Sequence, residues 1–230
     1  MKLSVIMPVF NEEKTLPSIL NRIFSLRDII ETEVIIVNDG STDATGEYLR
    51  HLHPGPNMIL LEHKKTLGKG AAIRTARGCA TGEVCIIQDA DLEYDPSDYI
   101  KLLEPIRSGR HLVVYGCRTL DPGGPRPSFM KFFIARTALS VAANILYAQR
   151  LTDEPTCYKA FETRFFKSIP LNCKGFEFCP EVTAKVSKRG IKIIEIPVRY
   201  TPRTHGEGKK IRWTDGVIAL WTLLKYRFVD

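Results

Sequence analysis

The chain has 230 residues, a net charge of +7 at pH 7 and an apolar share of 44%. This length suits one large domain, or a domain with a small appendage, and the apolar share is ordinary for a packed globular protein. The positive charge favours anionic partners such as nucleotides, phosphorylated lipids or an anionic membrane surface. Nucleic acid is disfavoured, because the basic residues are scattered rather than clustered with aromatic side chains.

The cysteines and histidines give no sign of a metal site. The six cysteines contain no C-x-x-C pair, and the five histidines show no ligand spacing, so we expect the histidines on the surface or in loops. A strand is expected from residue 3 onwards, which leaves no room for a signal peptide, and no apolar run is long enough to span a membrane. We therefore expect a cytoplasmic protein in a reducing compartment.

Strands and helices alternate through the first half of the chain. Apolar runs predict strands, and helical periodicity or helix-start signals predict the segments between them. Strands are expected at residues 3–10, 33–37, 58–61, 84–87 and 112–116, with helices starting near residues 14, 43, 68 and 95. This alternation predicts an α/β fold with a mostly parallel sheet and helices on both faces.

The second half begins with a loop and a long apolar helix. Residues 121–127 are rich in proline and glycine, and we expect a mobile loop there. Residues 129–147 form a nearly all-apolar helix interrupted by Lys131 and Arg136, two cations that make spanning a membrane costly. This helix could lie on a membrane, pack against another subunit or belong to the core of a subdomain.

The remaining elements are shorter and more polar. We expect a strand within residues 151–161, a helix ending at residue 188 and a strand at 191–200. The polar, glycine-bearing segment 203–210 is either a loop that closes over a ligand or a flexible surface turn. An amphipathic helix is expected at residues 213–228.

Three carboxylates follow the strand at residues 84–87. Asp89, Asp91 and Glu93 stand where that strand ends, and the carboxyl ends of strands are where open α/β sheets bind ligands. Carboxylates this close raise each other's pKa unless a cation neutralises them. All-oxygen ligands suit Mg²⁺ or Mn²⁺, which commonly keep open positions for substrate phosphates. The alternative is a solvated acidic turn before the next helix.

Two other strands of the predicted sheet also end in polar residues. They bring Glu12 and Asp39 to the same edge as the acidic cluster, which favours a nucleotide crevice. The absence of G-x-G-x-x-G after the first strand and of G-x-x-x-x-G-K-[ST] disfavours a dinucleotide dehydrogenase and a P-loop NTPase. Gly68-Lys69-Gly70 is either a phosphate-binding turn at a helix N-terminus or a plain turn.

Together these motifs resemble the GT-A glycosyltransferases of family 2, and the later ones most resemble the dolichol- or polyprenol-phosphate sugar synthases. The resemblance covers nearly the whole chain. It is carried, in order, by residues 7–13, 37–43, 68–70, the D-x-D motif at 89–91, and residues 115–118, 151–159 and 207–211.

The resemblance implies a single GT-A catalytic domain over residues 1–230, with a nucleotide-sugar-binding half at 1–118 and an acceptor-side half at 119–230. Asp91 and Glu93 would hold Mg²⁺ or Mn²⁺, although related synthases often carry glutamine in place of Glu93. Asp91, Arg118 and Asp153 would be the catalytic residues, with Arg118 facing the acceptor phosphate. The residues implied to bind the donor are Pro8, Val9, Glu12, Val37, Asp39, Lys69, Asp89, Ala90, Arg203 and Lys209.

The implied reaction moves a sugar, with inversion, from a UDP- or GDP-linked donor to a polyprenyl phosphate. Transfer to a sugar hydroxyl is a second hypothesis, and Asp153 would then be the general base. A third is a non-catalytic nucleotide-sugar-binding subunit. Many related synthases carry C-terminal membrane helices. This chain would instead dock peripherally on the cytoplasmic face through helix 129–147, its basic surface or a membrane partner subunit, and it could be a homo-oligomer.

Overall fold

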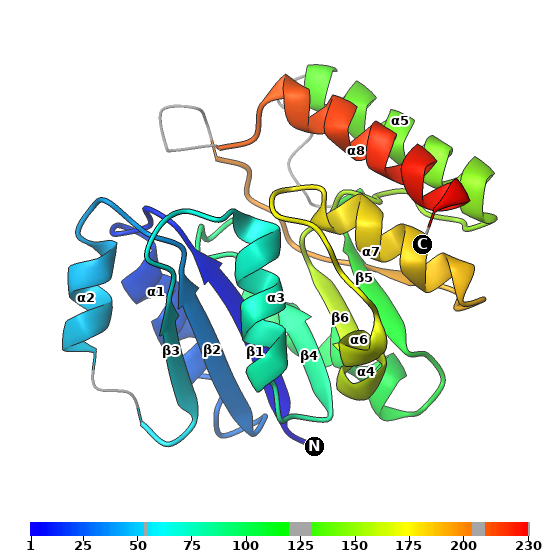
Figure 1. The fold of residues 1–230 in the computed structure, drawn as a ribbon. Helices are drawn as coiled ribbons and strands as arrows, with labels where there is room; N and C mark the ends of the chain where they lie inside the picture. Colours follow the sequence, from blue (N-terminus) through cyan, green and yellow to red (C-terminus); the bar gives the residue numbers. More distant parts are fainter. Residues whose placement is uncertain (53–54, 120–129, 204–209, 230) are drawn as a thin grey trace.

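The computed structural model describes residues 1–52, 55–119, 130–203 and 210–229, with the backbone alone at residues 130–133. The expected loop at residues 121–127 lies outside these ranges. Figure 1 shows a central sheet covered by helices. The strands are β1 (Leu3–Val9), β2 (Thr32–Asn38), β3 (Met58–Glu62), β4 (Val84–Ile87), β5 (Val113–Cys117), β6 (Lys159–Glu162) and β7 (Ile194–Pro197). The helices are α1 (Leu16–Phe24), α2 (Thr45–His51), α3 (Lys69–Cys79), α4 (Tyr99–Arg107, after a 3₁₀ turn at Pro96–Asp98), α5 (Met130–Tyr147), α6 (Thr163–Ser168), α7 (Phe178–Lys188) and α8 (Trp213–Phe228).

The described strands form one seven-stranded sheet in the order β3-β2-β1-β4-β6-β5-β7. The pairs β1–β2, β2–β3, β1–β4 and β5–β7 are parallel, which confirms the expected α/β class. The exception is β6, which runs antiparallel to both β4 and β5. The sequence did not predict that β6 would separate β4 from β5, because strand pairing depends on distant segments and not on local pattern.

Both faces of the sheet are buried, which is why its strands are nearly continuous apolar runs. Successive side chains of a strand point to opposite faces. Val5 of β1 therefore packs in the cluster that includes α1 and α4, and Ile6 packs in the cluster that includes α3, α6 and α7. These two layers fix the carboxyl ends of β1, β2 and β4 at one edge of the sheet.

The strand expected at residues 191–200 is shorter than predicted. Only residues 194–197 form β7, and the chain then leaves the sheet as an extended segment held by single contacts. Val198 N donates to Cys117 O (3.1 Å), and Thr201 N donates to Glu93 O (2.9 Å). Segment 198–203 therefore runs from the end of β5 to the acidic cluster that follows β4.

The long apolar helix α5 is paired with α8, and α8 also packs on α7 (Figure 1). The seam between α5 and α8 is narrow and consists of Leu139, Ala143, Ala219 and Leu223. The Tyr147 hydroxyl also donates to Leu223 O at 2.6 Å. The sequence allowed α5 to be a core helix of a subdomain. In the structure only one stripe of α5, with Leu139 and Ala143, is buried in this way. In the described ranges, no helix combines the length and apolar character needed to cross a membrane.

Candidate functional site

Acidic residues from three parallel strands meet at the carboxyl edge of the sheet. β1 lies between β2 and β4, so Glu12 after β1, Asp39 after β2 and Asp91 after β4 reach neighbouring positions. Glu12 and Asp39 are buried, at 7% and 3% exposure. Buried carboxylates need hydrogen bonds or counter-charges, so their partners show how the site is built.

Asp39 holds the segment that leads into α3. Its Oδ1 accepts from Leu67 N (2.9 Å) and lies 2.6 Å from His63 Nδ1, and its Oδ2 accepts from Gly68 N (2.8 Å). The Nε2 of His63 lies 3.0 Å from Thr75 Oγ1 of α3. His63 was expected on the surface or in a loop. It does lie in a loop, but its side chain is only 10% exposed and links Asp39 to α3. His63 directly follows β3, so the reasoning that placed Glu12 and Asp39 at the carboxyl ends of their strands could also have predicted His63 near the site.

Gly68-Lys69-Gly70 is a packed turn and not an open phosphate cradle. The N–H groups of Gly70 and Ala71 donate to Gly175 O (3.1 Å) and Lys174 O (3.0 Å). Gly68 has φ +101, and a Cβ there would lie 2.4 Å from Lys174 O, so the position requires glycine. The N–H groups of Gly68, Gly70 and Ala71 are therefore already used by the protein, which favours the plain-turn alternative.

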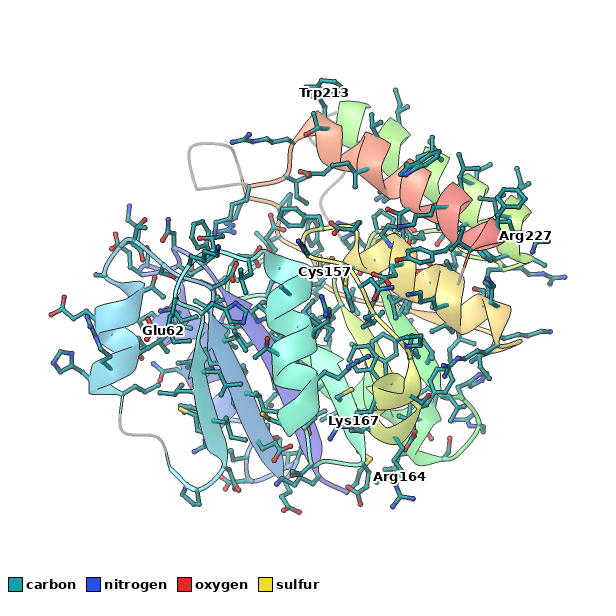
Figure 2. All side chains as sticks on the ribbon, viewed as in Figure 1. Glu62, Cys157, Arg164, Lys167, Trp213 and Arg227 are labelled. Atoms are coloured by element: carbon teal, nitrogen blue, oxygen red, sulfur yellow. The ribbon has the colours of Figure 1, made fainter. Side chains whose placement is uncertain are left out.

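The Lys69 side chain nevertheless belongs to the site. Its Nζ lies 2.6 Å from the Asp89 carboxylate and 3.0 Å from Cys157 Sγ, which is labelled in Figure 2. Burial alone would lower the pKa of Lys69, but the charge of Asp89 raises that pKa well above its ordinary value. Lys69 is therefore a fixed cation beside the D-x-D motif.

Asp91 is the member of the acidic cluster whose pKa is raised. Burial, followed by the charges of Asp89 and Glu93, raises the pKa of Asp91 to about 7. Asp91 Oδ2 lies 3.1 Å from Arg203 Nη2, and Oδ1 accepts from Glu93 N at 3.1 Å. Glu93 itself accepts from Tyr200 Oη (3.0 Å) and from Arg203 N (2.8 Å). From the sequence we expected a cation to neutralise the three carboxylates. In this structure Lys69 pairs with Asp89, and Arg203 pairs with Asp91.

The donor set fits a divalent ion only in part. Across the described ranges, no group of three or more His, Cys, Asp or Glu side chains is arranged to hold a metal ion. Mg²⁺, however, is often bound by one or two carboxylates together with water and substrate phosphates. Asp91 suits that role by its place after β4 and because burial beside Asp89 and Glu93 disfavours its charged form unless a cation is near. In this structure both oxygens of Asp91, like both oxygens of Glu93, accept hydrogen bonds from the protein.

Glu12 binds two cations that flank residues 204–209. Arg203 Nη1 and Nη2 lie 3.0 and 3.1 Å from the two Glu12 oxygens, and Lys210 Nζ lies 2.7 Å from Oε1. Lys209, named from the sequence, lies outside the described residues. Lys210 was not among the predicted site residues. The sequence signal that could have identified it is that two lysines stand side by side at 209 and 210.

Arg118 and Asp153, both named from the sequence, form a largely buried ion pair. Arg118 donates three hydrogen bonds to Asp153: from N (2.9 Å), Nε (2.8 Å) and Nη2 (2.6 Å). Asp153 is fully buried, which alone would raise the pKa of its carboxyl. The Arg118 guanidinium, with a smaller contribution from Arg136 of α5, holds that pKa below its ordinary value. Arg136 was not among the predicted site residues.

Three of the predicted donor-binding residues are core residues by their side chains. Val9 and Ala90 pack in the cluster that includes α1, and Val37 packs in the cluster that includes α3. They are at most 2% exposed and can offer only backbone groups to a ligand. Pro8, at the end of β1, is half-buried.

Fold and site together define an α/β protein with a cluster of charged residues at the carboxyl edge of its sheet. The family model described as glycosyl transferase family 2 matches residues 4–169, and the chain belongs to this family. The resemblance found in the sequence is thereby confirmed.

Known relatives add detail. The chain is 30% identical over 252 residues to the undecaprenyl-phosphate mannosyltransferase of Micrococcus luteus, with 99% of each chain covered. It is 28% identical to the dolichol-phosphate mannosyltransferase of Pyrococcus furiosus over 91% of its own length but only 59% of that protein's. The glucosyl-3-phosphoglycerate synthase of Mycobacterium tuberculosis, crystallised with Mn²⁺, UDP-glucose and phosphoglyceric acid, superimposes with a TM-score of 0.73 at 18% identity. That match covers 100% of this chain and 80% of the other, and at this identity it shows the fold alone.

Proposed function

We propose that the protein transfers a sugar from a nucleoside-diphosphate sugar to a polyprenyl phosphate at a membrane surface. The observation that carries this proposal is the state of Asp153. Its buried carboxylate is held by three hydrogen bonds from Arg118, and its pKa is lowered, so it is a poor proton acceptor near neutral pH. Asp153 is therefore a poor candidate for the base that a sugar hydroxyl would need, whereas a phosphate arrives already ionised.

The donor would bind across the ends of β1, β2 and β4. Asp39, Glu12 and Asp89 form the wall of this crevice, and Arg203, Lys210 and Lys69 are the cations within reach of a diphosphate. Asp91 would hold Mg²⁺ or Mn²⁺ together with the diphosphate. Such an ion, when bound, neutralises the charge that grows on the leaving diphosphate. Structural neighbours crystallised with Mn²⁺ or Mg²⁺ and UDP support this assignment.

The acceptor phosphate would lie beside Arg118. A phosphate monoester has a second pKa of about 6, so it is an anion at neutral pH and needs positioning more than proton removal. Arg118 and Arg136 both act electrostatically on Asp153, and these three groups together carry one net positive charge. Attack on the far side of the anomeric carbon from the diphosphate gives inversion. Residues 1–118 would thus supply most of the donor side, to which Arg203 and Lys210 of the second half reach back, and Arg118 would stand at the boundary with the acceptor side.

A donor screen tests the proposal. We expect UDP or GDP to be released from one nucleoside-diphosphate sugar only when polyprenyl phosphate is present. Nucleotide release with a glycan acceptor but not with polyprenyl phosphate would favour the hydroxyl reaction. Tight nucleotide-sugar binding with no release under any condition would indicate a non-catalytic binding subunit.

The helix pair α5–α8 gives the protein a surface for membrane contact. Outside their seam, these helices expose Ile134 and Ile145 of α5 together with Trp213, Val217 and Trp221 of α8. Figure 2 labels Trp213 and Arg227 near the two ends of α8. Exposed apolar side chains on paired surface helices, on a chain with net charge +7, are typical of interfacial binding to anionic lipid.

Tryptophan fluorescence measures this contact directly. The chain's two tryptophans, Trp213 and Trp221, are both on α8 and are 82% and 65% exposed. On addition of vesicles that contain anionic lipid, the emission of the two tryptophans should shift to shorter wavelength. Added salt should reverse part of this shift. Val217→Asp should weaken vesicle binding by about tenfold or more, since it removes an apolar contact and adds a charge.

Ile29→Asp is the matched control, because Ile29 is an exposed isoleucine (65%) outside the helix pair. Its vesicle affinity should stay at the wild-type value. Binding that ignores salt, anionic lipid and Val217→Asp alike would contradict membrane docking through α8.

A further inference from the structure

One tyrosine contacts both sides of the site. Tyr200 Oη donates to Glu93 Oε2 at 3.0 Å, next to the D-x-D motif. The ring of the same residue lies under Arg118, with the guanidinium carbon 5.0 Å from the ring centroid. Tyr200 was not among the residues predicted from the sequence, where it stood only as the last residue of an expected strand.

The topology explains why such a link is needed. Glu93 and Arg118 lie beyond the ends of β4 and β5, and these two strands pair with each other only through β6. Segment 198–203 crosses this gap. It begins at the hydrogen bond from Val198 N to Cys117 O and reaches β4's end through the bridge between Tyr94 and Tyr200.

The Tyr200 side chain is held firmly in that position. Its ring lies 5.2 Å from the ring of Tyr94, which in turn stacks on Tyr158 at 4.7 Å. A phenol can donate and a carboxylate only accepts, so the 3.0 Å contact fixes the direction of the hydrogen bond from Tyr200 to Glu93. Glu93 in turn accepts from Arg203 N, so the same contact supports the residue that reaches Glu12 and Asp91.

We infer that Tyr200 is a positioning residue that fixes the donor-side Glu93 and the acceptor-side Arg118 relative to each other. The inference rests on the proposed function, since an in-line transfer requires both substrates at a fixed separation. Displacement of a reacting group by about 1 Å can cost on the order of 100-fold in rate. Tyr200 should therefore affect turnover through its hydroxyl and acceptor binding through its ring.

Two substitutions separate these roles. Tyr200→Phe keeps the ring under Arg118 and loses the bond to Glu93, so turnover should fall by about 10- to 100-fold while the KM for polyprenyl phosphate changes less than about twofold. Tyr200→Leu removes the ring as well, and the acceptor KM should then rise by about tenfold. Tyr200→Phe carries the test by itself if Tyr200→Leu does not fold.

Tyr158→Phe is the control within the same aromatic stack. Its hydroxyl donates to Asp95 O at 2.9 Å and touches neither charged group, so turnover should stay within about twofold of wild type. In a Glu93→Ala background, Tyr200→Phe should cost less than about twofold, because its partner is already gone.

The outcomes distinguish the inference from the function. Wild-type turnover in Tyr200→Phe, the same acceptor KM in both Tyr200 variants, or an undiminished effect in the Glu93→Ala background would overturn the positioning role alone. A wild-type protein that transfers no sugar to polyprenyl phosphate would overturn both the role and the proposed function.

Discussion

Replacing Asp91 by alanine is expected to lower single-turnover transfer by about 10²- to 10⁴-fold. Breaking a catalytic metal site removes several kcal/mol of transition-state stabilisation, and about 1.4 kcal/mol corresponds to a factor of ten. The structure makes Asp91 the sensitive position, because burial and the charges of Asp89 and Glu93 raise its pKa to about 7, so that its ionised form gains most from a nearby cation. The measurement is transfer at saturating donor, titrated with Mn²⁺ or Mg²⁺.

Folding and catalysis can be separated in the same variant. The raised pKa means that ionised Asp91 costs the folded state stability as the pH rises from about 4 towards 7. The melting temperature of Asp91→Ala in EDTA at pH 8 should therefore equal or exceed that of wild type. Asp95→Asn, which removes a carboxylate four residues away and keeps an N-cap acceptor, should retain normal turnover. Near-normal transfer by wild type or by Asp91→Ala in EDTA would contradict the metal assignment.

Asp153→Asn is expected to keep a substantial part of the transfer rate, whereas Arg118→Ala should lose about 10²-fold or more. An ionised phosphate needs Arg118 to hold it, and charge-assisted hydrogen bonds contribute about 1.5–3 kcal/mol each. If Asp153 were a general base, its loss would cost about 10²–10⁴-fold and the order would reverse. The measurement is single-turnover transfer to polyprenyl phosphate by wild type and both variants.

Arg118→Ala needs a stability control, since it leaves the buried Asp153 carboxylate without its main counter-charge. Leaving a buried charge without its partner lowers the free energy of unfolding by about 3–5 kcal/mol. The double variant Arg118→Ala/Asp153→Asn should recover melting temperature but not rate.

A pH profile adds a second readout. The rate should fall below about pH 6, where the acceptor phosphate becomes protonated, in wild type and in Asp153→Asn alike. A loss of three or more decades in Asp153→Asn, with Arg118→Ala still active, would overturn the lipid-phosphate acceptor.

Local pattern predicted several elements closely. The strand expected at residues 84–87 is β4, and the amphipathic helix expected at 213–228 is α8, with the same bounds. The short helix α6 was not predicted, because six residues are too few to show helical periodicity. The strand-end argument correctly placed Glu12, Asp39 and Asp91 at one edge, because β1, β2 and β4 are parallel neighbours whose carboxyl ends point the same way.

The sequence left two alternatives open, and only the packing of distant segments bears on them. The glycine turn at residues 68–70 has the composition of a phosphate-binding turn, yet Gly70 N and Ala71 N donate to the carbonyls of Gly175 and Lys174. Asp153 is a residue type that can act as a general base, yet Arg118 clamps it and lowers its pKa. In both cases the deciding partner lies tens of residues away, beyond the reach of a local pattern.

The α/β class, the family and the edge at which chemistry-bearing residues gather all follow from the amino-acid sequence, because periodicity and strand-end position are local properties of the chain. Which of those residues are available to act, and which are held, depends on the tertiary structure. Arg203 reaches Glu12 across 191 positions and Asp91 across 112, and Tyr200 joins Glu93 to Arg118 across the intervening β6. The physical reason is that a buried charge takes its pKa and its role from whichever counter-charge or donor the fold places within about 3 Å.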